Sequence, residues 1–413
     1  MAINKFVDRQ GNTLLDLSTD SVSPSKVLAG TTYHGPDGTK QMGTLDPGPL
    51  DYSQYNFIDY DGTLLYSYTD EELDALTALP AGPDHTGDNL TFQSWNWTLA
   101  DLKAWDRTRS DRPLIGANYI TTDGKSYLYL DTPLSGATLS FQTNGTLNSV
   151  DWGDGTTDTT TSHVYTNPGQ YVIVIDMAKD GYWYFGTSDP STSTNKQWVK
   201  KIKLGNIKST GAYTYAFYQC YALQNISIPN NLTSIGSGMF RTCDSLQNVI
   251  IPNSATSIGD YAFDMCYSLK NISIPNSITS IGEYTFSDCR SLTSITIPSS
   301  VTGIREGLFR RCTSLQNISI LNSLTSIANS LFSSCYSIKN ISIPNSITRI
   351  GTSAFYEIKA LTLDLSKQTK VITLSSSIGL NNIYSKILVP STLLADYKSA
   401  SYWSDYASIM VGV

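Results

Sequence analysis

The chain has 413 residues, of which 40% are hydrophobic and 15% charged, and its formal net charge is −7. Residues 1–200 carry 12 Lys or Arg against 25 Asp or Glu, whereas residues 201–360 carry 12 against 7. The acidic half argues against a nucleic-acid partner, and the small positive excess that follows is too dilute to suggest one. No apolar run of 18 residues is present, and the opening MAINKFVDRQGN lacks a signal-peptide pattern. We therefore expect no membrane insertion and synthesis in a cytoplasm.

The first 133 residues predict two small modules. Residues 1–50 end in the Gly-rich LAGTTYHGPDGTKQMGTL, and residues 51–133 are expected to form a small α+β domain. Two strands at residues 57–60 and 63–68 flank Asp61-Gly62, a dipeptide suited to a type I′ hairpin. A second such dipeptide, Asp123-Gly124, predicts another hairpin.

Two helices are expected in the same domain. Thr69 and Glu72 form a capping box for a helix with the apolar residues 73, 76 and 79, and Pro80 ends it. A second helix is expected after Trp95-Asn96-Trp97 and through Trp105. The Gly-rich stretch, together with DYDGTLLYSYT and SWNWTLADLKAW, resembles segments of tail and baseplate proteins of phages that infect Gram-positive bacteria. That resemblance implies attachment of residues 1–50 to other particle proteins.

Residues 134–178 predict a small β domain. Trp152-Gly153-Asp154-Gly155 reads as a tight turn between strands, and YVIVI, starting at Tyr171, reads as a buried strand. These letters resemble a PKD domain, which implies an immunoglobulin-like sandwich. Asp151 and Asp158 flank the turn, but their spacing lacks the EF-hand order of calcium ligands, so turn chemistry explains them better than a metal. Residues 179–200 would be a linker.

A tandem repeat of 23 residues dominates the C-terminal half. Six cysteines fall at that interval: Cys220, Cys243, Cys266, Cys289, Cys312 and Cys335. Seven phenylalanines do the same: Phe217, Phe240, Phe263, Phe286, Phe309, Phe332 and Phe355. A fixed period of this length predicts a solenoid in which each unit buries its apolar face against its neighbours. We expect about seven units over residues 201–360.

One unit, LKNISIPNSITSIGEYTFSDCRS from Leu269, shows how a turn is built. Its L-x-x-I-x-I predicts a strand that sends its isoleucines inward and Ser273 outward, and Pro275 ends that strand. Ile358 takes the cysteine position in the last unit, so we interpret the cysteines as buried small hydrophobes. Disulfides are the alternative. Metal binding is not indicated, because the three histidines lie outside the repeats.

The IPxSxTSIGxxAFxxCxSL signature of residues 201–360 resembles the BspA-type leucine-rich repeat, which implies a role in adhesion. Residues 361–413 look like the usual C-terminal cap of such arrays. There, residues 361–365 and 387–390 predict two more strands. A short helix from Ser391 follows, with Trp403 and Tyr406 as aromatic plugs.

Candidate contact residues lie next to the cysteines, where the letters vary from unit to unit. The outward strand positions form a monotonous polar row, mostly asparagine. Tyrosine and arginine dominate binding hot spots, which makes these six the candidate ligand-binding residues: Tyr221, Tyr267, Arg290, Arg310, Arg311 and Tyr336. The alternative is that they are solvated loop positions. We find no catalytic motif and predict neither an enzyme nor a cofactor.

The sequence therefore predicts a mainly β, multidomain chain: small N-terminal α+β modules, an immunoglobulin-like PKD-like sandwich and a leucine-rich-repeat solenoid. The functional expectation is a phage tail or baseplate-associated virion protein, made in the host cytoplasm, whose repeats bind host cell-surface glycan or protein. A homo-oligomer, such as a trimer, would suit that role. The alternatives are a bacterial surface adhesin of the BspA type and a decoration protein that binds nothing.

Overall fold

The computed structural model describes residues 50–413, except residues 52, 110, 134, 179–180, 186–195, 206–213, 317, 322 and 381–383. Before residue 50 it describes four short strands: β1 (Lys5–Val7), β2 (Thr13–Asp16), β3 (Thr32–His34) and β4 (Lys40–Met42). β1 pairs antiparallel with β2, and β3 with β4. The rest of the predicted attachment module lies outside the described residues.

An α+β unit spans residues 55–121. Its strands are β5 (Tyr55–Ile58), β6 (Leu64–Tyr68), β7 (Leu90–Trp95) and β8 (Leu114–Thr121), in the sheet order β6-β5-β8-β7. The first predicted hairpin is confirmed, with Gly62 at a φ of 92° in its turn. β8 runs parallel to β5 and lies between β5 and β7, so this small sheet is mixed.

The two helices of the unit are shorter than predicted. They are α1 (Asp70–Ala75) and α2 (Leu99–Lys103), with a 3₁₀ turn, η2 (Thr86–Asp88), between them. Thr69 and Glu72 form the predicted capping box of α1, but the backbone becomes extended at Leu76, before Pro80 is reached. A helix of six residues buries only Leu73 fully, and its stability comes from packing on the sheet.

The second predicted hairpin is wrong. Asp123-Gly124 does turn the chain, with the Gly124 amide donating to the Thr121 carbonyl at 3.1 Å. However, the next strand, β9 (Ser126–Thr132), pairs with β15 and β17 and not with β8. The turn therefore joins two different sheets, because the partners of β9 lie in the unit that follows.

A β unit follows, built from β9 to β16. The remaining strands are β10 (Ala137–Ser140), β11 (Gln142–Asn144), β12 (Leu147–Asp151), β13 (Thr157–Asp158), β14 (Ser162–Tyr165), β15 (Gly169–Met177) and β16 (Tyr182–Tyr184). Trp152, Tyr165 and Trp183 fill its core. Gly153 is required at a φ of 79°, where a side chain would meet the Val172 backbone at 2.7 Å.

The aspartates of this unit serve its turns. Asp151 accepts from the Gly153 amide, Asp154 from the Thr156 amide, and Asp158 from the Thr160 amide, each two residues further on. This is the Asx-turn pattern by which a short carboxylate replaces a backbone acceptor. The turn chemistry expected from the sequence is therefore present. Whether the unit is a PKD domain stays a prediction.

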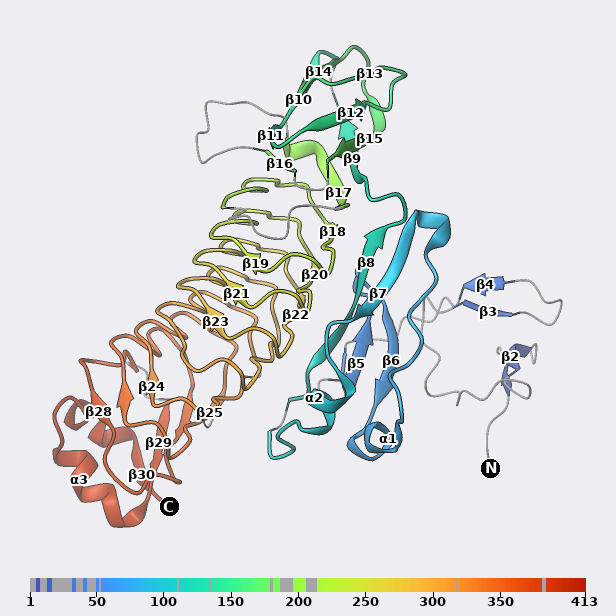
Figure 1. Ribbon diagram of the computed structural model, residues 1–413. Helices are drawn as coiled ribbons and strands as arrows, with labels where there is room; N and C mark the ends of the chain where they lie inside the picture. The colour runs from blue at the N-terminus through green and yellow to red at the C-terminus, as the bar shows by residue number, and fades with distance from the viewer. Residues whose placement is uncertain are drawn as a thin grey trace.

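One continuous sheet joins this unit to the repeats. β17 (Val199–Lys203), preceded by a 3₁₀ turn η3 (Lys196–Trp198), pairs antiparallel with β9 and parallel with β18. The sheet order β13-β12-β15-β9-β17-β18-β20-β22 thus runs through eight strands. The first turn of the stack is capped by these strands, as Figure 1 shows.

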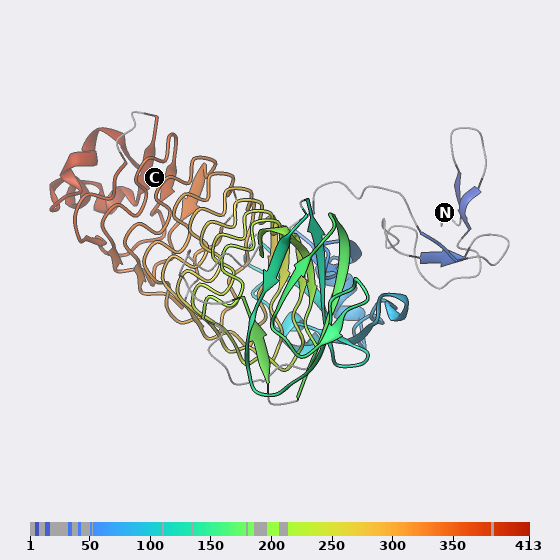
Figure 2. The same ribbon diagram turned by 90° about the horizontal axis from the view of Figure 1, so that it is seen from above.

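The predicted solenoid is confirmed, and its parallel strands form two rows (Figures 1 and 2). The first row contains β18 (Asn225–Ser227), β20 (Asn248–Ile250), β22 (Asn271–Ser273), β25 (Asn340–Ser342), β27 (Thr362–Asp364), β29 (Lys386–Val389) and β30 (Met410–Gly412). The second contains β19 (Ser234–Ile235), β21 (Ser257–Ile258), β23 (Ser280–Ile281), β24 (Ser326–Ile327), β26 (Arg349–Ile350) and β28 (Thr373–Leu374). The ladder continues beyond the seven predicted units and makes about nine turns.

Phenylalanine and cysteine columns fill the interior. Consecutive rings from Phe217 to Phe355 stack at 5.3–6.0 Å between centroids, within 15° of parallel. All six cysteines are buried and free of disulfides, so the disulfide alternative is wrong. Burial raises the pKa of the Cys335 thiol to about 12. Full burial of each Phe contributes roughly 1.5–3 kcal/mol.

The cysteines contribute more than apolar volume. The thiol of Cys289 donates to the Phe263 carbonyl of the previous turn at 3.3 Å, and Cys312 does the same to Phe286 at 3.0 Å. Equivalent bonds run from Cys243, Cys266 and Cys335. The interpretation of the cysteines as buried small hydrophobes is therefore incomplete. Ile358 fills the space but brings no donor.

Residues 361–413 contain the two predicted strands and a short helix, and the ladder continues among them with β28 and β30. η4 (Ser391–Leu393), α3 (Leu394–Ser399) and η5 (Ser404–Ile409) cover the last turns. Trp403 and Tyr406 are buried, and each also ties down backbone: the Trp403 indole donates to the Ile372 carbonyl at 2.6 Å, and the Tyr406 hydroxyl accepts from the Ile378 amide at 3.1 Å. These bonds satisfy polar groups that the stack leaves open at its end.

Candidate binding site

The α+β unit closes part of the first strand row, which limits where a ligand can bind. Figure 1 shows this unit alongside β18, β20 and β22. Ser273, expected to point outward, does leave the core, but it is fully buried against the Asn96 side chain and the Leu114 carbonyl. Asn248 is also buried and donates to the Asp61 carbonyl at 2.7 Å. The outward polar row is therefore an internal interface over these turns.

One apolar residue marks this interface. Ile250 stands in the outward column where the neighbouring turns have Ser227 and Ser273, and it is only 4% exposed. It belongs to the core of the α+β unit and packs on Gly116, where an added Cβ would meet its side chain at 2.5 Å. Only a glycine allows β8 to approach the strand row so closely.

Further polar contacts extend the interface along the stack. The Asn276 amide donates to Asp101 at 3.0 Å, and the Arg109 guanidinium donates to the Ile297 carbonyl at 3.1 Å. Ser319 donates to Asp111 at 2.8 Å. The closed part of the row thus reaches Ser319, whereas Asn340 and Ser342 on β25 are exposed.

The six sequence-predicted contact residues lie beside the cysteine column, but only some are open. Tyr221 and Tyr336 are each 39% exposed, and Arg290 and Arg311 are exposed. Tyr267 and Arg310 are half-buried. Each turn reverses here through a left-handed residue just before the cysteine, such as Asp288 at a φ of 57°. That reversal directs the neighbouring side chains away from the core.

Three of the candidates meet around one buried carboxylate. Arg290 donates to Asp288 at 2.9 Å and its guanidinium lies 4.6 Å from the Tyr267 ring centre. The Arg311 guanidinium lies 3.7 Å from the same carboxylate. The structure thus brings Tyr267, Arg290 and Arg311 together. Both guanidinium groups are already paired with Asp288, and the Tyr267 ring is already in contact with Arg290. Tyr221 and Tyr336 lie on separate turns of the column.

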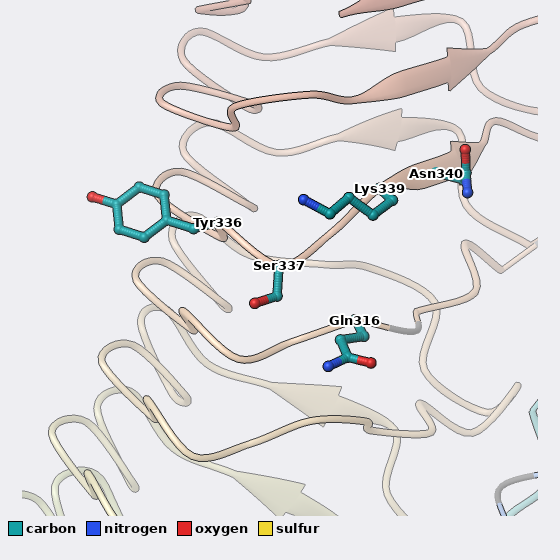
Figure 3. Close-up of a pocket in the computed structure, with 5 residues that line it drawn as sticks. All are labelled: Gln316, Tyr336, Ser337, Lys339 and Asn340. Carbon is teal, nitrogen blue, oxygen red and sulfur yellow. The ribbon is translucent and has the colours of Figure 1, made fainter. Parts of the chain in front are cut away.

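A hollow of about 480 Å³ opens beside Tyr336. Gln316, Tyr336, Ser337, Lys339 and Asn340 line it. Figure 3 shows the Lys339 side chain extending from the start of β25 toward the side that carries Tyr336, with Gln316 on the neighbouring turn. The volume lies within the range of small-molecule sites.

The hollow presents a cation and an aromatic ring. Among the residues that the structure describes, no carboxylate lies within 4.0 Å of the Lys339 ammonium. The Tyr336 hydroxyl donates to Glu357 at 3.3 Å, and the Lys359 ammonium lies 5.6 Å from the Tyr336 ring centre. Ser337 donates to the Thr313 carbonyl at 2.7 Å, which leaves its oxygen able to accept.

Gln316, Lys339 and Asn340 were not among the predicted residues, although the sequence carries a signal for them. The stretch YSIKNISIPNSITRIG from Tyr336 nearly repeats YSLKNISIPNSITSIG from Tyr267. Their residues differ only at Leu269/Ile338 and Ser280/Arg349. The hollow's full set recurs three turns earlier as Gln247, Tyr267, Ser268, Lys270 and Asn271.

The earlier copy of this set has different neighbours. Asn271 donates to Asn248 at 2.9 Å, at the edge of the docked α+β unit, and Arg290 covers the Tyr267 ring. Asn340 is exposed instead, and Tyr336 is more open than Tyr267. The same residue types therefore form a largely half-buried set in one place, where only Lys270 is exposed, and an open hollow in another.

Two features that mark other kinds of site are absent from the residues that the structure describes. Those residues contain no cluster of three His, Cys, Asp or Glu side chains fit to ligate a metal ion. Nor do they contain a helix of the length and apolarity needed to span a bilayer.

Comparison with known protein families identifies the repeats. The model of the BspA type leucine rich repeat region matches residues 210–309 and 256–384, with six copies. Residues 210–384 are a BspA-type leucine-rich repeat region. The match falls on the turns that carry the phenylalanine and cysteine columns and the hollow. A search of curated proteins gives no match.

Several solved structures resemble the chain. A leucine-rich repeat protein from Bacteroides ovatus is 24% identical, with a TM-score of 0.44 over 60% of this chain and 70% of its own. The T. pallidum leucine-rich repeat protein is 24% identical, with a TM-score of 0.33 over 41% and 78%. A leucine rich cell surface protein from Faecalibacterium prausnitzii is 20% identical, with a TM-score of 0.20 over 52% and 81%.

Proposed function

We propose that this chain is an adhesion protein of a phage tail or baseplate, which holds the particle to the host bacterial surface through its BspA-type repeats. The observation that carries the binding role is the contrast between a constant interior and a varied exterior. Phenylalanine and cysteine recur at every turn, whereas the exposed position after the cysteine changes through Tyr221, Arg290 and Tyr336. Such variation on a fixed scaffold suits recognition and not packing.

The assignment to a phage particle is supported by the N-terminal segments. The Gly-rich stretch of residues 1–50 and the DYDGTLLYSYT segment resemble tail and baseplate proteins. Attachment of many copies to one particle would convert weak single contacts into tight adsorption, because each further contact forms at high effective concentration. We therefore propose other tail proteins as partners of the N-terminal region and a symmetric homo-oligomer, such as a trimer, as the state on the virion.

A bacterial surface adhesin of the BspA type is the second candidate. The family match favours it, because that match covers the repeats and does not reach the N-terminal segments on which the particle assignment depends. Both candidates share the binding role and differ in where the chain resides.

Two measurements test the proposal. Full-length chain carrying a fluorescent label should stain whole Gram-positive host cells, and excess unlabelled chain should compete the stain away. Unstained cells would contradict the binding role and leave a decoration protein. Electron microscopy of purified particles with gold-labelled antibody against the chain should place gold at the tail tip; gold on bacterial surfaces alone would favour the adhesin.

A further inference from the structure

We propose that the hollow at Gln316, Tyr336, Ser337, Lys339 and Asn340 binds an acidic glycan, with a sugar ring on the Tyr336 face and its acid group on the Lys339 ammonium. This inference rests on the proposed binding function and names the ligand class of that function. It assigns the contact to one open site among several similar turns.

The positive charge of the Lys339 ammonium favours a negatively charged ligand in the hollow. Lys339 lies among amides and hydroxyls, without a carboxylate partner in the described residues within 4.0 Å. A lysine ammonium offers three donors, and a charge-assisted hydrogen bond to a carboxylate or phosphate is the strongest contact it makes. Lys359 adds a second cation near the Tyr336 ring. The Glu357 carboxylate accepts hydrogen bonds from Tyr336 and Ser334 and is not within 4.0 Å of the Lys339 ammonium.

The remaining lining suits a sugar. The exposed part of the Tyr336 ring offers a flat surface for the C–H bonds of a sugar ring, and its side chain has only about two χ angles to order. Gln316 and Asn340 each present an amide with donors and acceptors, and Ser337 retains an accepting oxygen. Sugar hydroxyls both donate and accept, so they pair with such groups. A purely apolar ligand would leave all of them unpaired.

Comparison with the near-copy at Tyr267 and Lys270 explains why we assign binding to the hollow at Tyr336 and Lys339. It has the same five residue types, but Asn271 is bound to Asn248 and the Tyr267 ring lies under Arg290. Asp288 holds Arg290 in that position through two hydrogen bonds. A ligand at this copy would have to displace Asn248 and the Arg290–Asp288 pair. At the hollow, Asn340 is exposed, and the Lys359 ammonium over the Tyr336 ring has no carboxylate within 4.0 Å among the described residues.

The test measures binding of the full chain to immobilised polymers by biolayer interferometry. Polygalacturonate supplies carboxylates, phosphomannan supplies phosphates, and dextran serves as the neutral comparator. We expect binding to at least one acidic polymer, little to dextran, and weaker binding at higher salt. Lys339→Gln and Tyr336→Ala should each weaken it about tenfold, as loss of one charge-assisted or aromatic contact does. The matched control Lys270→Gln should change affinity by less than about twofold.

Three outcomes would overturn the inference: binding to neither acidic polymer, equally tight binding to dextran, or equal losses for Lys270→Gln and Lys339→Gln. Melting temperatures of all variants show that they remain folded. Staining of host cells separates the two proposals. Cells stained equally by wild type and Lys339→Gln would leave the adhesion role standing without this site, whereas unstained cells with intact polymer binding would refute only the adhesion role.

Discussion

Nearly the same local sequence occurs in two different surroundings, at Tyr267–Gly282 and at Tyr336–Gly351. Both make a turn of the same solenoid, with the same buried isoleucines and the same proline at the strand end. In the first, Ser273 is fully buried under the α+β unit; in the second, Ser342 is exposed. The repeat sequence thus determines the fold of the turn. Whether the outer face of that turn is exposed to solvent depends on the docked α+β unit.

The largest expected effect is a loss of folding stability, and it tests the buried cysteine column that continues beneath both stretches. Cys266→Asp and Cys335→Asp each place an unpaired carboxylate in the buried column, and each should destabilise the solenoid by about 3–5 kcal/mol. Losses in the same range are expected because both side chains are fully buried, although Ile358 follows Cys335 in the column where Cys289 follows Cys266. Denaturant unfolding followed by circular dichroism measures both. A native-like stability for either variant would contradict the buried ladder.

The next effect tests the docked α+β unit, which covers the first stretch and not the second. Ile250→Asn removes an apolar side chain from the core of the α+β unit and buries an amide there, which should cost about 3 kcal/mol or more and release the unit from the strand row. Limited proteolysis and thermal unfolding should both report that release. Ser342→Asn, in the same column on the open face, is the control and should melt like wild type. Equal sensitivity of the two variants would show that the unit is not docked.

A smaller effect concerns the thiol hydrogen bonds. Cys335→Ala deletes the donor to the Phe309 carbonyl and leaves a small cavity, so we expect a loss of about 1–2 kcal/mol. Cys335→Ser keeps a donor at that position and should lose less. In native buffer all six thiols should resist thiol reagents because all six are fully buried. Burial also raises the pKa of the Cys243, Cys266, Cys289, Cys312 and Cys335 thiols. Rapid labelling of several thiols would contradict the column.

The smallest expected effect is a dependence of folding stability on pH, which arises in the α+β unit that covers the early turns. The hydrogen bond that His85 donates to Asp59 raises the pKa of His85 above its ordinary value, burial opposes the shift, and Asp88 adds to it. Because the folded-state pKa is raised, this stabilisation is complete below a pH of about 6.5 and disappears as the pH rises through the raised value. Lys203 approaches Asp88 from the solenoid side.

Unfolding of wild type and His85→Gln between pH 5.5 and pH 9, in about half-unit steps, measures this term. The stability advantage of wild type should shrink as pH rises. An advantage that stays constant, or grows with pH, would contradict the role given to the Asp59–His85 pair.

The repeat was predictable because its period acts through a single rule, the burial of equivalent residues at equivalent turns. Phe217 to Phe355 could be placed from spacing alone, and Trp403 and Tyr406 from their position after the short helix that starts at Ser391. The docking of the α+β unit depends on contacts between residues more than 100 positions apart, such as Asn96 with Ser273. No local pattern encodes such a pair, although Ile250 in a serine column was a visible exception.

The candidate site was predicted in part. Tyr336 was identified from the variable column after the cysteines. Neither Lys339 nor Asn340 was, because the polar strand row that contains Asn340 looked uniform from the sequence and Lys339 lies just before that row. Arg290 and Arg311 were candidates as exposed cations, and the structure shows that they share Asp288. Sequence gives the side chains that are present, but the partners that already engage them become visible only in three dimensions.

Hydrogen–deuterium exchange of the full chain, with and without a saturating acidic polymer, tests the central claim most directly. The claim is that the α+β unit closes the strand row as far as Ser319 and leaves the binding surface on the later turns. Peptides covering residues 336–342 should gain protection from the polymer, and those covering 267–273 should be slow to exchange in both states. Polymer-dependent protection at 267–273, with none at 336–342, would contradict the account.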